Sequence, residues 1–167
     1  MQGKKALALL GAATAANAFG ATRPNVVIIV ADDLGWGDVS YHGSVIPTPN
    51  IDRLIGEGIE LNRFYTAPVS SPTRCGLMTG RYPSRFGIRE TVIPPWRDYG
   101  LPVEEETMAD LLGRNGYTNR AAIGKWHMGH SRLRYYPLNR GCTQGYGTNR
   151  TYPQASQKAE WNHKGRP

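Results

Sequence analysis

The spacing of hydrophobic positions predicts alternating strands and helices along the chain. Residues 25–31 (NVVIIVA) form an unbroken run rich in β-branched residues, typical of a central parallel strand covered on both faces. Residues 59–65 alternate apolar and polar side chains, which predicts a second strand, and residues 118–123 predict a weaker third. Residues 48–58 and 107–115 have helical spacing. This order indicates an α/β fold on a parallel sheet with right-handed crossovers.

The first helix has residues that can start and end it, and the second has a residue that can end it. Thr48 or Asn50 can cap the first helix and Gly58 can end it, while Gly116 can end the second. Their apolar faces are expected to be buried; these are Ile51, Leu54 and Ile55 in the first helix and Met108, Leu111 and Leu112 in the second.

A loop that runs into a short helix follows the second predicted strand. Ser71 is a plausible N-cap, Pro72 suits the first helical position, and Gly80 can end the helix in a left-handed conformation. Ser70 would then lie just before a helix N-terminus, which favours an anion, and Arg74 follows one turn later. A hydroxyl, an anion-binding backbone and a fixed cation suit attack on a phosphate or sulfate ester. The alternative is that both serines serve only the turn and the cap.

Two adjacent carboxylates, Asp32 and Asp33, follow the first predicted strand. Carboxylate pairs beside a buried strand are costly unless they are paired or bind a metal. Hard oxygen ligands of this kind suit Ca²⁺ or Mg²⁺. The alternative is an Asx-turn that caps the strand.

A third polar group, Lys125 and His127, follows the third predicted strand. A lysine can bind an anionic oxygen, and a histidine can move protons near neutral pH. The alternative is a solvated loop with Trp126 packed inward. Because ligand sites of open α/β sheets gather at the carboxyl ends of the strands, the three polar groups are expected to meet in one crevice.

Composition narrows the class of protein. The chain has 167 residues, a length that allows one domain at most. Its formal net charge is +7. The charge is concentrated at the two ends rather than spread as a nucleic-acid footprint, so no nucleic-acid partner is expected. Cys75 and Cys142 do not make a disulfide framework, and Cys75 is interpreted as a packing residue.

The N-terminus has the pattern of a secretory signal. Lys4 and Lys5 precede a short Ala/Leu run, and Ala16-Asn17-Ala18 matches a small-residue cleavage pattern. We therefore expect a signal peptide over residues 1–21 and export to the periplasm or the extracellular space. No other segment is long and apolar enough to suggest stable membrane insertion.

Four ordered motifs resemble those of the sulfatase family. They are Asp-Asp-Leu-Gly-Trp-Gly-Asp at 32–38, Thr-Pro-Asn-Ile-Asp-Arg-Leu at 48–54, Ser-Ser-Pro-Thr-Arg at 70–74 with Thr-Gly-Arg at 79–81, and Gly-Lys-Trp-His-Met-Gly at 124–129. The resemblance covers residues 24–141, is arylsulfatase-like, and implies an alkaline-phosphatase-like α/β/α sandwich. The chain would hold the N-terminal part, so the fold would be incomplete.

The resemblance also implies roles for individual residues. Ser70 would be oxidised by a maturase to formylglycine, whose hydrate has one hydroxyl to attack sulfur and one to lose a proton and expel sulfate. Arg74 and Lys125 would steady the nucleophile and the sulfate, and His127 would hydrogen-bond the hydrated aldehyde. Asp32 and Asp33, with the group at Ser70, would hold Ca²⁺, with Mg²⁺ as the alternative ion. The substrate would be a sulfated small molecule or glycan.

After Leu138 the chain contains no Val, Ile, Leu, Met or Phe. We therefore divide it into a signal peptide (1–21), the N-terminal part of a sulfatase catalytic domain (22–141) and a polar tail of uncertain origin (142–167), which is a genuine tail or a segment read out of frame. Because later metal and sulfate ligands of the family cannot be assigned, the chain is expected to be weakly stable and weakly active or inactive. The alternatives are a phosphate or phosphonate ester hydrolase and a non-catalytic fragment that binds anions.

Overall fold

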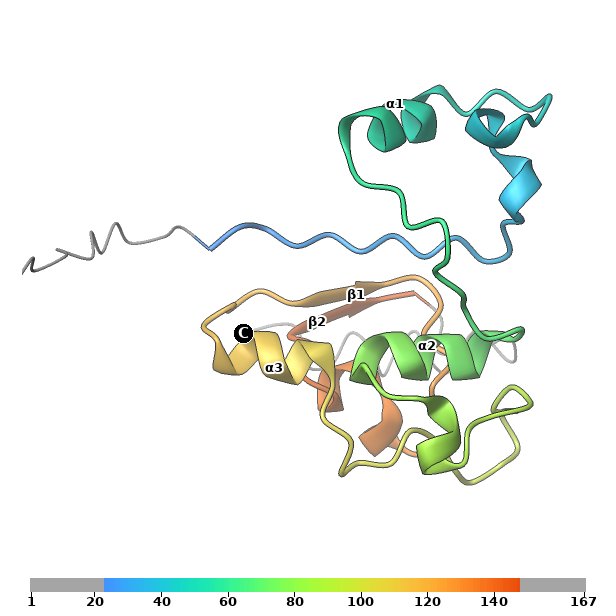
Figure 1. The fold of residues 1–167 in the computed structure, drawn as a ribbon. Helices are drawn as coiled ribbons and strands as arrows, with labels where there is room; N and C mark the ends of the chain where they lie inside the picture. Colours follow the sequence, from blue (N-terminus) through green and yellow to red (C-terminus); the bar gives the residue numbers. More distant parts are fainter. Residues whose placement is uncertain (1–22, 148–167) are drawn as a thin grey trace, which may run out of the picture.

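The structure is a computed structural model that describes residues 23–147. The expected signal peptide and residues 148–167 of the expected tail lie outside the described residues. Two parallel strands, three α-helices and several 3-10 helices make up the described part (Figure 1). In chain order the α-helices and strands are α1 (Pro49–Glu57), α2 (Ser70–Thr79), α3 (Met108–Arg114), β1 (Ala121–Ile123) and β2 (Gln144–Tyr146).

The sheet consists of β1 and β2, which pair in parallel. Ala121 lies opposite Gln144, and Ile123 lies opposite Tyr146. The parallel α/β class is therefore confirmed, in an incomplete form. β2 lies within residues 142–167, so residues 144–146 of the expected polar tail take part in the sheet.

Two of the three predicted strands are absent from the sheet. Residues 25–31 run extended, but they form no strand, and the side chains of Val27 and Ile29 are 80% and 84% exposed. Residues 59–65 contain a turn and no strand. A strand needs a neighbour to satisfy its backbone N–H and C=O groups, and no described strand is hydrogen-bonded beside either segment. Figure 1 shows residues 25–31, in blue, as a single extended ribbon.

The predicted limits of helices α1 and α3 are confirmed more fully than their buried faces. Thr48 is the N-cap of α1 and Gly58 its C-cap. Thr107 caps α3 in a capping box with Asp110, whose backbone N–H donates to the Thr107 hydroxyl at 3.2 Å. The predicted buried faces are wrong in part: Leu54 of α1 is exposed, and it is Ala109 that α3 buries, while its Leu111 is exposed.

Helix α2 begins earlier than predicted. Its N-cap is Val69 and its first residue is Ser70, so Ser71 is not the cap. The reason is tertiary: the Ser71 hydroxyl is fully buried and accepts a hydrogen bond from the Ile93 N–H at 2.9 Å. Gly80 ends the helix with φ of 65°, as its freedom in the left-handed region predicts.

The core lies under α2 and α3. The segment 82–106 is irregular apart from the 3-10 helix η3 (Pro83–Phe86). Although it lacks regular structure, it contributes three residues to the core. The buried cluster consists of Cys75, Ile88, Ile93, Leu101, Ala109, Trp126, Met128, Tyr136 and Cys142.

A buried cation joins the end of the described chain to this core. Arg140 is 3% exposed, and its guanidinium donates to the carbonyls of Leu101 at 3.2 Å, Pro102 at 2.9 Å and Glu105 at 2.6 Å. The Thr107 hydroxyl donates to the Arg140 carbonyl at 3.1 Å. The segment that leads into β2 is thus packed by polar contacts rather than by aliphatic side chains.

Residues 34–66 carry α1 and stand above the rest of the chain in Figure 1. A polar cluster holds this part together. The Ser40 hydroxyl donates to Asp52 Oδ2 at 2.6 Å, and the Thr48 hydroxyl donates to Asp52 Oδ1 at 3.0 Å. Residues of the Thr-Pro-Asn-x-Asp motif therefore have a structural role here.

His42 of the same part is expected to titrate above the ordinary histidine range. Its Nε2 lies 2.7 Å from Glu60 Oε1, and this carboxylate raises the pKa of His42. Because the pKa of His42 is raised, its ion pair with Glu60 stabilises the folded state below the ordinary histidine pKa. This contribution to the free energy of unfolding is lost as pH rises through the raised value. An NMR titration should show the His42 pKa falling in Glu60→Gln but not in Glu57→Gln. An unchanged pKa in Glu60→Gln would contradict this coupling.

None of the helices within residues 23–147 is long and apolar enough to cross a membrane.

Candidate active site

Helix α2 positions the candidate nucleophile and its cation. Ser70 and Arg74 are four residues apart, so they lie on the same face of the helix. Arg74 Nε donates to Ser70 Oγ at 3.1 Å. The serine hydroxyl is therefore held at the first turn of a helix, beside a permanent positive charge.

The guanidinium of Arg74 also joins two distant segments. One terminal nitrogen donates to the Lys125 carbonyl at 2.6 Å, and the other donates to Asp32 Oδ2 at 3.0 Å. All three predicted polar groups, which are up to 93 residues apart along the chain (Asp32 to Lys125), thus meet at the side chain of Arg74. Their predicted meeting is confirmed.

The same carboxylate oxygen contacts a second cation. Lys125 Nζ lies 2.7 Å from Asp32 Oδ2, and the Asp32 side chain is 19% exposed. The Lys125 ammonium first, and then hydrogen bonds from Asp33 and Arg74, hold the pKa of Asp32 well below its ordinary range. Asp32 is therefore ionised at neutral pH. In this structure Lys125 reaches Asp32, whereas the family resemblance assigns it to the nucleophile and the sulfate.

Asp33 adjoins Asp32 in the chain and interacts with its carboxylate. A hydrogen bond to Asp32 and the negative charge of Asp32 raise the pKa of Asp33. Two adjacent carboxyl groups, one of which is joined to Ser70 through Arg74, are hard oxygen donors, and their mutual repulsion is what a divalent cation relieves. The donor type therefore fits Ca²⁺ or Mg²⁺, although residues 23–147 hold no cluster of three or more His, Cys, Asp or Glu that could hold a metal.

His127 approaches Ser70 from the loop that follows β1. Its Nδ1 lies 3.1 Å from Ser70 Oγ. Burial first, and then the positive charge of Lys125, lower the pKa of His127 to about 4, so the imidazole is neutral at neutral pH. Its backbone has φ of 59°, an uncommon conformation for a residue other than glycine. Such conformations cost about 1–3 kcal/mol and persist where the surroundings enforce them.

Trp126 anchors this loop. Its indole is buried and donates to the Tyr135 carbonyl at 2.7 Å. The inward packing of Trp126 is therefore observed, yet Lys125 and His127 on either side of it still reach the site, so the loop is not merely solvated.

Two residues that support the site, Ile93 and His130, were not predicted from the sequence. The Ser71 hydroxyl accepts from the Ile93 N–H at 2.9 Å, and His130 Nε2 donates to the Ile93 carbonyl at 2.9 Å. The His127 and His130 rings are 5.3 Å apart. Only the position of His130, three residues after His127, could have suggested it; Ile93 has no local signal.

The candidate nucleophile is not Cys75. This residue is fully buried in the core, and burial raises the pKa of its thiol to about 12. The interpretation of Cys75 as a packing residue is confirmed.

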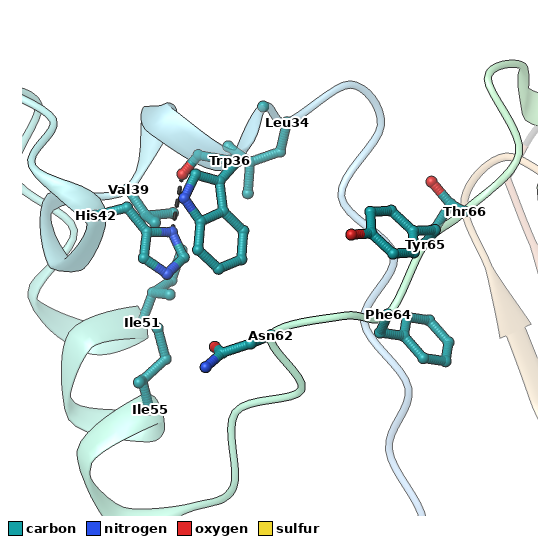
Figure 2. Close-up of a pocket in the computed structure, with 11 residues that line it drawn as sticks. Leu34, Trp36, Val39, His42, Ile51, Ile55, Asn62, Phe64, Tyr65 and Thr66 are labelled. Atoms are coloured by element: carbon teal, nitrogen blue, oxygen red, sulfur yellow. Dashed lines mark hydrogen bonds between the residues drawn. The ribbon is translucent and has the colours of Figure 1, made fainter.

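A hollow elsewhere on the chain is separate from this site. It has a volume of about 640 Å³ and lies in the part that carries α1. Figure 2 shows Trp36 and His42 side by side on its wall, with Ile51 and Ile55 below them. None of the predicted site residues lines it.

Comparison with known proteins identifies the family of this chain. The Sulfatase family model matches residues 24–166. The chain is 36% identical over 161 residues to N-acetylgalactosamine-6-sulfatase of Rattus norvegicus (86% of this chain, 30% of the relative) and 44% identical over 128 residues to arylsulfatase A of Bos taurus (75% and 25%). The solved structure of Ps i-CgsB matches with 34% identity and a TM-score of 0.61, over 79% of this chain and 30% of that one. The chain belongs to the sulfatase family.

Two details of these matches bear on the domain organisation. The chain spans about a quarter to a third of the length of these relatives. The family match also continues to residue 166, beyond Gly141, where the recognisable motifs end. The segment after Gly141 thus carries family similarity that the motifs did not reveal.

Proposed function

We propose that this chain contributes the nucleophile side of a sulfatase active site, in a protein that hydrolyses sulfate esters. One observation carries the proposal: Ser70 Oγ lies 3.1 Å from both Arg74 Nε and His127 Nδ1. A hydroxyl-bearing residue between a fixed cation and a neutral imidazole suits attack on an anionic ester.

We further propose that Ser70 is converted to formylglycine by a radical-type maturase. The hydrated aldehyde supplies a geminal pair of hydroxyl groups, one for attack on sulfur and one for release of sulfate. The position of Ser70 supports this proposal, because its hydroxyl contacts both Arg74 and His127. Ser71, by contrast, is buried and bound to Ile93.

The other side chains have distinct roles in the proposed reaction. Arg74 orients the group at position 70 and offers positive charge to the sulfate. Lys125 adds a second positive charge through an ammonium that is partly exposed. His127, neutral at neutral pH, can accept a proton at Nδ1 or donate one there after protonation.

Asp32, Asp33 and the group at position 70 would hold a divalent cation, which we propose to be Ca²⁺. Such an ion supplies positive charge that polarises a bound oxygen. Asp32 is then shared between the ion and the two cations that now contact it, Arg74 and Lys125. Further oxygen ligands are needed to reach the six to eight that Ca²⁺ takes.

The substrate class and the location follow from the relatives and the N-terminus. The names of the relatives include an N-acetylgalactosamine-6-sulfatase and an arylsulfatase, so we propose a sulfated glycan or small aryl sulfate as substrate. We propose that residues 1–21 direct export, and that residues 22–141 belong to the catalytic domain.

Mass spectrometry of the peptide that contains Ser70 tests the proposal. In chain made in a host with a formylglycine maturase, residue 70 should lose about 2 mass units, the two hydrogens removed when an alcohol becomes an aldehyde. Ser71 in the same peptide is the internal control and should keep its hydroxyl. Ser70→Ala should abolish the mass change.

An unmodified Ser70 in that host would contradict the formylglycine proposal. Turnover of phosphate esters by the same unmodified chain would then favour a serine-based phosphoesterase. Loss of two hydrogens at Ser71 instead would contradict the assignment of residue 70.

A further inference from the structure

The segment that follows η3 is tied to the candidate active site at one residue. The Ile93 N–H donates to the Ser71 hydroxyl, and its carbonyl accepts from His130, each at 2.9 Å. Ser71 is the neighbour of Ser70, and His130 follows His127 by three residues. Ile93 is therefore fixed between the two segments that carry the reacting groups. In Figure 1 the loop after η3 projects at the end of the molecule where α2 begins.

A rigid turn begins directly after Ile93. The Arg97 N–H donates to the Pro94 carbonyl at 3.1 Å, which closes a β-turn with Pro95 at its second position, where proline is favoured. Asp98 then accepts from Arg132 Nε at 2.8 Å and from the Ser131 hydroxyl at 2.9 Å. Hydrogen bonds thus hold the chain at Ile93, directly before the turn, and at Asp98, directly after it.

This turn presents a large aromatic side chain to solvent. Trp96 occupies its third position and is 81% exposed. Three residues span at most about 10 Å, so Trp96 stays within that reach of Ile93 and hence near the candidate site. The adjoining Arg97 is also exposed. The exposed indole of Trp96 offers a flat apolar face, with its own N–H and the neighbouring Arg97 guanidinium as polar groups.

We propose that Trp96 is a substrate-binding residue that stacks on the sugar ring of a sulfated glycan, with Arg97 beside it for a further anionic group. This inference rests on the proposed function, because the sulfate of the same sugar would lie at Arg74 and Lys125. A sugar ring has an apolar C–H face that suits an indole and a hydroxyl rim that suits a guanidinium. Binding energy from such a remote contact positions the reacting ester.

Calorimetric binding of two probes to the full chain tests the inference. The probes are inorganic sulfate, which reports on the anion site alone, and N-acetylgalactosamine 6-sulfate, which adds the sugar ring. The sugar sulfate should bind wild type more tightly than inorganic sulfate. Trp96→Ala should weaken the sugar sulfate about tenfold and leave inorganic sulfate unchanged. Trp96→Phe, which keeps an aromatic face, should restore most of the loss.

Tyr82→Ala is the matched control. Tyr82 is 77% exposed but follows the C-terminal end of α2, a ten-residue helix about 15 Å long that has Ser70 at its other end. It should bind both probes as wild type does.

The outcomes separate this inference from the proposed function. Equal affinity of wild type and Trp96→Ala for the sugar sulfate overturns the inference, as does a wild type that binds the sugar sulfate no more tightly than inorganic sulfate. If inorganic sulfate does not bind but Trp96→Ala still weakens the sugar sulfate, the inference stands and the anion site fails. An equal loss in Tyr82→Ala also overturns the inference, because it would show a general aromatic effect.

Discussion

Replacing Arg74 with alanine should weaken binding of inorganic sulfate about tenfold to a hundredfold. Arg74 is the side chain that joins Ser70, Asp32 and the Lys125 carbonyl, at 3.1, 3.0 and 2.6 Å. Hydrogen bonds to charged groups contribute about 1.5–3 kcal/mol each, and 1.4 kcal/mol corresponds to a factor of ten in affinity. Isothermal titration calorimetry on the full chain measures the change.

Arg74→Lys separates charge from geometry. A lysine keeps the positive charge but has a single nitrogen, whereas the planar guanidinium uses three nitrogens for three partners. Affinity in Arg74→Lys should therefore lie between those of wild type and Arg74→Ala. An affinity equal to that of wild type in Arg74→Ala, with far-UV circular dichroism unchanged, would contradict a role for Arg74 in the anion site.

Asp32→Asn should have the opposite effect when chelator removes divalent ions. Asp32 Oδ2 contacts both Lys125 Nζ and the Arg74 guanidinium, so it competes with an external anion for both cations. Removing its charge should strengthen sulfate binding under these conditions. Weaker sulfate binding by Asp32→Asn would show that Asp32 holds the two cations in place rather than competing for them.

Replacing Arg140 with methionine should lower the free energy of unfolding by about 3 kcal/mol or more. The side chain is buried, and its loss leaves the carbonyls of Leu101, Pro102 and Glu105 without the donor that now satisfies them. Each buried carbonyl left without a donor costs about 1–3 kcal/mol, so the loss at three carbonyls amounts to about 3 kcal/mol or more. Because a domain is stable by only about 5–15 kcal/mol, a large share of the stability would be lost. Urea denaturation measures it.

Arg89→Met is the matched control for Arg140→Met. Arg89 is exposed and pairs with its exposed neighbour Glu90, and exposed ion pairs contribute about 0–1 kcal/mol. Its stability should match wild type. Equal stability of wild type and Arg140→Met would show that residues 140–147 are not part of the cooperative unit.

The elements that depend on neighbouring residues were the ones that sequence predicted well. Helix α1 begins after Thr48, one of its two expected caps, and α3 (Met108–Arg114) lies within the predicted range 107–115. Gly80 ends α2 because the left-handed conformation there suits glycine. Capping and helix termination are local, so the residues that decide them are adjacent in the chain.

Strands and burial were predicted less well because they depend on distant partners. Residues 25–31 have the composition of a central strand, but within residues 23–147 the strand β1 is hydrogen-bonded only to β2, which lies in a polar segment without a strand pattern. The segment 82–106 likewise lacks periodicity, yet Ile88, Ile93 and Leu101 are in the core. Nothing in a window of adjacent residues indicates which surface such a segment will cover.

For the candidate site, the sequence by itself indicated which side chains would lie together: Ser70 and Arg74 by helical spacing, and Asp32, Lys125 and His127 by their places after predicted strands, although the strand predicted before Asp32 does not form. Only the tertiary structure decided their partners. Lys125 pairs with Asp32. Ser71 is hydrogen-bonded to Ile93. Ser70 instead contacts Arg74 and His127. Residue type and spacing define the chemistry that a segment can offer, whereas a hydrogen bond between distant segments depends on the packing of the whole chain.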